Sequence, residues 1–198
     1  MTAELLLAFV VFAIVMSVTP GPNNAMIVAC VANFGLRRTI PHLCGIDSGM
    51  IVMIVAVGLG LGGLFEAWPP LYDVLRWGGA AWLLWLAWRM ARSSSLKGGR
   101  GRVRPLSFVG AAAFQWVNPK AWVLSLAAVA AYIPQGGYFR NLVIVAVVFS
   151  LFSIPSIGLW AGFGMTLRRF RDVPGRIVLF KRVMAALLVL SIYPILTH

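Results

Sequence analysis

The stretch Thr19-Pro20-Gly21-Pro22-Asn23-Asn24 interrupts a hydrophobic run that extends from Leu5 to Phe34. Each proline lacks a backbone N–H donor and its ring clashes with the preceding helical turn, so no straight helix passes through this stretch. At the depth of a membrane, backbone groups freed by such a break need protein or water as partners. We therefore expect two half-helices here, with the break lining a cavity.

A second break, Asn118-Pro119-Lys120, lies inside another hydrophobic run. The two breaks fall about halfway along their segments and divide the chain into similar halves. Interrupted hydrophobic segments at matching positions of two halves point to the binding site of a secondary transporter. The pattern therefore predicts a transporter whose substrate site lies at the two breaks.

The composition is that of an integral membrane protein. Of the 198 residues, 61% are hydrophobic and 11% are charged, and the mean hydropathy is +0.90. Soluble domains average roughly 45–50% apolar and about 25% charged residues. At about 20 residues per span, the length accommodates six helices. The expected fold class is an all-α integral membrane protein with six transmembrane helices.

The polar residues exclude several other classes. The net charge of +12 does not indicate nucleic-acid binding, because Lys and Arg gather between the apolar runs, as the positive-inside rule requires. Cys30, Cys44, His42 and His198 lack the spacing of a disulfide framework or a metal site. We expect no metal, no cofactor and no nucleic-acid partner. The N-terminus, with Glu4 before the apolar run, does not read as a cleaved signal peptide.

The apolar runs give the expected spans. As one helix the first run would be about 46 Å long, more than the ~30 Å hydrocarbon core, and the proline break resolves this excess. In the second run, Gly45 with Gly49 and Gly58 with Gly62 favour close packing of helices. A polar turn with Pro69-Pro70 follows at residues 66–73. The spans are expected at about residues 4–34, 41–65, 74–91, 106–132, 140–165 and 177–196.

The charges between the spans predict the orientation. Arg37 and Arg38 mark the first connection, and the third and fifth connections hold nearly all other Lys and Arg residues. These connections should face the cytoplasm and both termini the outside. Three spans per half then make the second half inverted relative to the first. We expect one transmembrane domain with repeats at about 1–92 and 106–198, joined by a basic loop at about 93–105, and broken helices 1 and 4.

These residues resemble the LysE/RhtB family of amino-acid exporters. The resemblance rests on Thr19-Pro20-Gly21-Pro22-Asn23, the glycine-rich second span and Asn118-Pro119-Lys120-Ala121, and it covers essentially the whole chain. It implies export of amino acids or close derivatives from the bacterial cytoplasm, across the plasma (inner) membrane, driven by the proton gradient. The chain departs from the family pattern where Met50 follows the second glycine and the acid, Asp47, lies between the glycines.

Two charged residues inside predicted spans are candidates for the site. Asp47 is the acid within the second span, and an acid in a membrane costs about 2.5–3.5 kcal/mol on the insertion scale. It either binds a substrate ammonium or the coupling proton, or it pairs with Lys120 or is hydrated at the cytoplasmic edge. Lys120 either binds a carboxylate beside the proline break, or it snorkels or pairs with Asp47.

The remaining candidates are uncharged. Asn23 and Asn24 begin the second half-helix. Its free backbone amides and the positive end of its dipole suit a substrate carboxylate. The alternative, that the two asparagines cap this half-helix, is compatible with substrate binding. Ser150, Ser153 and Ser156 share one side of the fifth span, near Pro155, and either contact substrate or pack. The expected substrate-binding residues are Pro20, Gly21, Pro22, Asn23, Asn24, Asp47, Asn118, Pro119, Lys120 and Ser153.

One acid, one base and helix termini match an amino acid, which carries one cation and one anion. We expect an amino-acid exporter, with the bilayer around it and protons as the coupling ion. The alternatives are an exporter of another small solute or ion, and a non-transport assembly subunit. Metal export is disfavoured because the spans lack His, Cys and carboxylate clusters. No set of catalytic side chains indicates an enzyme. The oligomeric state is open, with a homodimer as one alternative.

Overall fold

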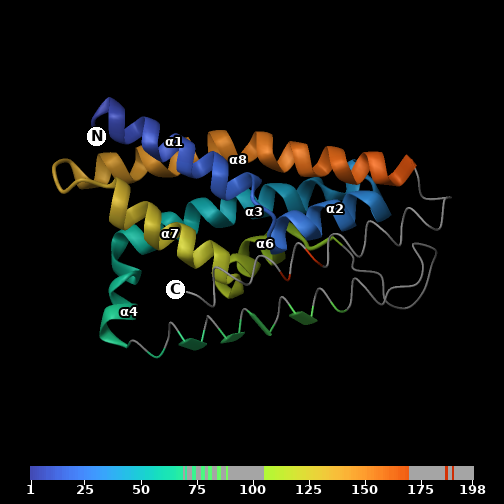
Figure 1. Cartoon of the computed structure of the whole chain (residues 1–198), viewed down its shortest axis with the longest axis horizontal. Coiled ribbons are helices and arrows are strands. Elements are labelled where there is room, and N and C mark those ends of the chain that lie inside the picture. The colour runs from blue at the N-terminus through green and yellow to red at the C-terminus, as the bar shows by residue number, and fades with distance from the viewer. Residues whose placement is uncertain are drawn as a thin grey trace.

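A computed structural model of the chain describes residues 1–68 and 105–169, with isolated positions between 70 and 88 and at 186 and 189. This part of the chain is helical and contains no strand (Figure 1). Its helices are α1 (Ala3–Val18), α2 (Pro22–Phe34), α3 (Leu36–Ala56), α4 (Gly63–Ala67), α6 (Phe108–Phe114), α7 (Pro119–Tyr132) and α8 (Tyr138–Arg169). A π-helical turn covers Val57–Leu61 and a 3-10 turn covers Gln115–Val117.

The long helices are those of a membrane protein. Leu36–Leu61 and Tyr138–Arg169 are each long and apolar enough to cross a membrane, and the pair α1–α2, bent by 51°, makes a third span when it is counted as one. The expected class of all-helical membrane protein is thereby confirmed. Most of the third and sixth spans, at 74–91 and 177–196, and most of the basic loop lie outside the described residues, so the number six stays a prediction.

Helix α8 holds the two halves of the broken pair together. It lies alongside α1 and α2 (Figure 1), and α3 packs against α6 and α8. Small residues make the closest approaches: a Cβ on Gly45 would lie 2.3 Å from the Phe108 carbonyl oxygen, and one on Gly49 would lie 2.6 Å from the Ala112 Cα. The glycines of α3 therefore let its backbone touch that of α6, which confirms their predicted role in packing.

Three arginines border one groove at the end of the bundle opposite Met1. At one end the N-terminal amine of Met1 donates to Asn141 Oδ1 at 3.2 Å, close to the start of α8. At the other end Arg37 and Arg38, in the first turn of α3, border one groove with Arg168 from the last turn of α8. The first and fifth connections thus bring their arginines to the same end, away from the N-terminus (Figure 1).

Two expected boundaries are wrong. The second span was expected to begin near residue 41, but α3 begins at Leu36 and includes Arg37 and Arg38. Gly35 has φ +83, a left-handed conformation that glycine adopts without a steric penalty, and it reverses the chain in a single residue. Pro41 then lies within α3 rather than before it.

The second span also does not continue straight to residue 65. Gly60, with φ +116, bends the chain within the π-helical turn, and Gly63–Ala67 forms the separate helix α4. Figure 1 shows α4 turning away from the axis of α3. The expected polar turn therefore begins inside a helix, because Glu66 belongs to α4.

Candidate functional site

The first break has the predicted form of two half-helices. Helix α1 ends at Val18, and Gly21 is extended, with φ −170 and ψ 180. Pro22 is the first residue of α2, where its missing N–H costs nothing because that group has no helical partner. No side chain caps α2, whereas Asn24 Nδ2 donates to the carbonyls of Ser17 and Thr19, at 3.0 and 2.9 Å, and so closes the end of α1.

The second break is also present. The 3-10 turn that follows α6 ends at Val117, and the next residue, Asn118, is extended, with φ −93 and ψ 108. Its Oδ1 accepts a hydrogen bond from the Lys120 backbone N–H at 3.2 Å, so Asn118 is the N-cap of α7. Pro119 is the first residue of α7, in the same place that Pro22 has in α2.

The two breaks contact each other in a reciprocal way. Lys120 Nζ, in the first turn of α7, donates to the Thr19 carbonyl at 2.6 Å and to the Pro20 carbonyl at 3.4 Å, at the end of α1. Asn23, in the first turn of α2, exchanges amide hydrogen bonds of 2.9 and 3.3 Å with Gln115, at the end of α6. The start of each second half-helix is therefore bonded to the end of the other first half-helix.

Gln115 is a residue that sequence reasoning missed. Its side chain is fully buried, and besides Asn23 it contacts the Ala111 carbonyl, to which Nε2 donates at 2.9 Å. The available signal was an amide inside an apolar run, three residues before Asn118. A buried amide needs hydrogen-bond partners, and the break in the other half of the chain provides them.

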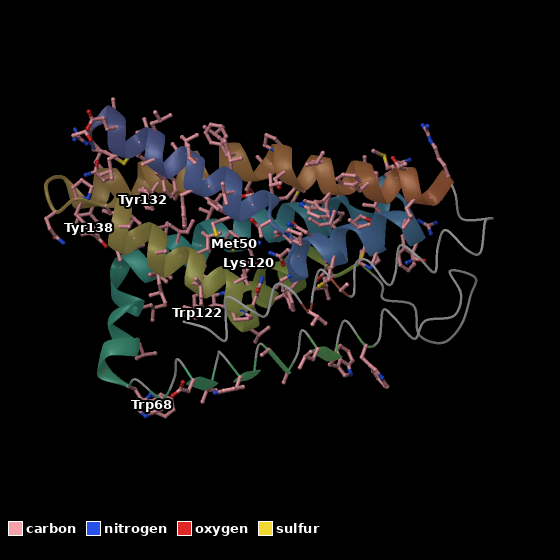
Figure 2. The ribbon with its side chains drawn as sticks, viewed as in Figure 1. Met50, Trp68, Lys120, Trp122, Tyr132 and Tyr138 are labelled. Carbon is pink, nitrogen blue, oxygen red and sulfur yellow. The ribbon has the colours of Figure 1, made fainter. Side chains whose placement is uncertain are left out.

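A cavity of about 60 Å³ lies at this junction. Figure 2 shows two of its lining residues, Lys120 and Met50, near the middle of the bundle. Trp68, at the lower end of α4, lies far from both. Seven of the ten expected site residues line it, and Pro20, Pro119 and Asp47 do not. The full lining is Met16, Ser17, Gly21, Pro22, Asn23, Asn24, Ile46, Met50, Asn118, Lys120, Ala121, Leu124, Phe149, Ser153, Ser156 and Ile157.

Asp47 does not line the cavity but contacts a residue that does, Ser153. Its carboxylate accepts hydrogen bonds from the Ser150 hydroxyl, at 2.6 Å, and from the Ser153 hydroxyl, both on α8. Among the described residues Asp47 and Lys120 do not form an ion pair, since the ammonium of Lys120 is bound to carbonyls of α1. Ser153 therefore stands between the acid and the cavity that it lines.

The ends of the half-helices set the electrostatics of the junction. The C-terminal carbonyls of α1 carry partial negative charge and stabilise the Lys120 ammonium that they bind. The uncapped N-terminus of α2 contributes partial positive charge and N–H donors at the same cavity. A cation and amide donors thus line one small space, and the carbonyls that bind the cation lie next to it. Broken apolar helices around such a space are the architecture of a membrane transporter.

The comparisons with known proteins identify the family. Residues 14–190 match the LysE type translocator family, and the chain belongs to it. The cysteine/O-acetylserine efflux protein of Escherichia coli K12 is 31% identical over 178 residues, which are 89% of this chain and 90% of that protein. The protein of that name from Shigella sonnei Ss046 gives the same values. No solved structure matches the chain. Family membership confirms the expected class, a transporter rather than an enzyme.

Proposed function

We propose that this protein exports small amino acids or close derivatives from the bacterial cytoplasm, with the substrate bound at the junction of the two breaks. Membership of the translocator family and the relatives named for cysteine and O-acetylserine efflux support the transport of amino acids. The observation that carries the proposal is that both breaks line one cavity, together with Lys120.

The cavity and the carbonyls next to it provide opposite partners for the two ends of an amino acid. The substrate carboxylate binds the Lys120 ammonium and the free N–H groups at the start of α2, both of which favour an anion. The substrate ammonium takes over the carbonyls of Thr19 and Pro20 that Lys120 occupies in this structure. One water needs a cavity of about 10–15 Å³. The cavity of about 60 Å³ therefore has room for several waters, which suits a small amino acid.

Asp47 is better placed to bind the coupling proton than to bind the substrate ammonium. Two hydroxyls already bind its carboxylate, and the carboxylate is not part of the cavity wall. Ser153 both donates to Asp47 and lines the cavity, so a proton on Asp47 changes the hydrogen bonding of a residue beside the substrate. Proton antiport through this contact is our proposal for the coupling.

The reciprocal contacts support the proposed inverted repeats. A two-fold axis in the membrane plane would relate the pair α1–α2 to the pair α6–α7. Under this symmetry the contact of Lys120 with the end of α1 would correspond to the contact of Asn23 with Gln115 at the end of α6. We propose one domain of six spans in the inner membrane, with both termini outside. This orientation is supported by three arginines at one end of the bundle, Arg37, Arg38 and Arg168. A homodimer remains a prediction.

Counterflow in proteoliposomes tests the proposal without assuming a coupling ion. Vesicles loaded with unlabelled serine should accumulate labelled serine transiently when they contain the wild-type chain. Lys120→Met should insert normally and lose this signal, because the carboxylate loses its charged partner. Arg140→Gln removes an exposed cation from the first turn of α8 and should transport as the wild type does. The absence of counterflow for any amino acid with the wild-type chain would refute the proposal.

A further inference from the structure

The further inference concerns which amino acids the cavity accepts, and it rests on the proposed function. We infer that Ser156 of α8 and Ser17 of α1 form a subsite for the substrate side chain. This subsite selects small amino acids whose β-carbon carries a hydrogen-bonding group, such as a hydroxyl, a thiol or an ester oxygen.

Both serine hydroxyls are buried and without a hydrogen-bond partner in the described part of the chain. Ser156 is 5% exposed, and both residues line the cavity at the junction. A buried hydroxyl without a partner destabilises a protein, because it has lost its bonds to water and gained none in return. Two such groups on one small cavity indicate that the molecule bound there supplies their partners.

Each of the other polar side chains of the cavity makes at least one hydrogen bond, Asn118 by accepting at Oδ1 from the Lys120 backbone N–H. Ser153 donates to Asp47, Lys120 donates to the end of α1, and Asn23 and Asn24 bond to Gln115 and to α1. Lys120 and the start of α2 are assigned above to the charged groups common to all amino acids. The hydroxyls of Ser17 and Ser156 are the buried polar atoms of the described lining that have no partner at all, and we assign them to what differs between amino acids, the side chain.

The small size and the lining set the substrate class. Ile46, Met50 and Phe149 surround the rest of the space with apolar atoms and leave little room beyond a short side chain. A site built to hydrogen-bond a polar group disfavours an analogue that lacks it, since its own polar groups are then left unpaired. Serine and cysteine should therefore bind more tightly than alanine, which has the same backbone and a methyl group instead.

Ser156→Ala tests the subsite, and Ser125→Ala is its matched control. Ser125, on α7, is also fully buried with an unpartnered hydroxyl, but it does not line the cavity. Half-maximal concentrations for counterflow would be measured with labelled serine and with labelled alanine in each variant. A neutral hydrogen bond contributes enough to change affinity about three- to tenfold. Ser156→Ala should lower the preference for serine over alanine by that factor, and Ser125→Ala should leave it unchanged.

Thermal stability in detergent gives a second readout that does not need transport. Serine should raise the melting temperature of the wild type and of Ser125→Ala more than alanine does, and Ser156→Ala should lose this difference. An unchanged preference in Ser156→Ala, or an equal loss in Ser125→Ala, would overturn the subsite while leaving amino-acid export intact. If the wild type moved and bound no amino acid, the proposed function would fail as well, which is a separate result.

Discussion

The amide pair between Asn23 and Gln115 gives a quantitative test of the contact between the two breaks. Two hydrogen bonds, at 2.9 and 3.3 Å, join side chains that are 92 residues apart in sequence. Hydrogen bonds between helices of a membrane protein average about 0.6 kcal/mol each in double-mutant cycles. The two bonds together should give a coupling energy of about 1.2 kcal/mol.

The cycle compares Asn23→Leu, Gln115→Met and the double variant by equilibrium unfolding in mixed micelles. Each single change strands the other amide, so their summed destabilisation should exceed that of the double variant by the coupling energy. Asn33→Leu with Gln115→Met is the control, because Asn33 donates only within its own helix in this structure, to the Ala29 carbonyl at 2.7 Å. Additivity within about 0.3 kcal/mol for Asn23 and Gln115 would refute the contact between the breaks.

Three further results are expected. Gly49→Ala should destabilise the fold by about 1–3 kcal/mol in thermal unfolding, because its Cβ would lie 2.6 Å from the α6 backbone; Gly63→Ala, with nothing within 4 Å, is the control, and equal effects would contradict the packing. Asp47→Asn should keep counterflow but abolish accumulation driven by a pH gradient, and retained accumulation would remove Asp47 from the coupling. With a membrane-impermeant maleimide, Arg38→Cys should react only from the cytoplasm and Gly136→Cys only from outside; the opposite pattern would invert the topology.

The breaks could be predicted from sequence because their cause is local. Pro20 and Pro22, two residues apart, remove two backbone donors, and Asn118 directly before Pro119 is an N-cap residue. A lone proline does not suffice, since Pro41 lies within α3 and Pro155 within α8. The structure has both breaks where the prolines lie. The bend at Gly60 and the one-residue turn at Gly35 were not predicted, because glycine permits a positive φ without requiring it.

The partners within the site depend on tertiary structure and could not be predicted from sequence in the same way. The sequence allowed Lys120 to bind a substrate carboxylate, to snorkel or to pair with Asp47, and none of these alternatives included the carbonyls at the end of α1 that it binds here. Opening a helix creates carbonyl acceptors as well as amide donors, so a cation near one break can serve the other. Gln115 gave no periodic signal, since a single amide in an apolar run does not indicate its partner.

Substrate protection of a cysteine in the cavity tests whether the substrate binds at the junction of the two breaks. Met50 is 4% exposed and lines the junction, whereas Val52, two residues further along α3, is 56% exposed and is not among the lining residues. Met50→Cys and Val52→Cys would each be made in a chain that carries Cys30→Ala and Cys44→Ala, and their rates of maleimide labelling would be measured. Serine should slow the labelling of Met50→Cys but not of Val52→Cys, and ethanolamine, which lacks the carboxylate, should protect neither. Equal rates for Met50→Cys with and without serine would contradict a substrate site at the junction of the two breaks.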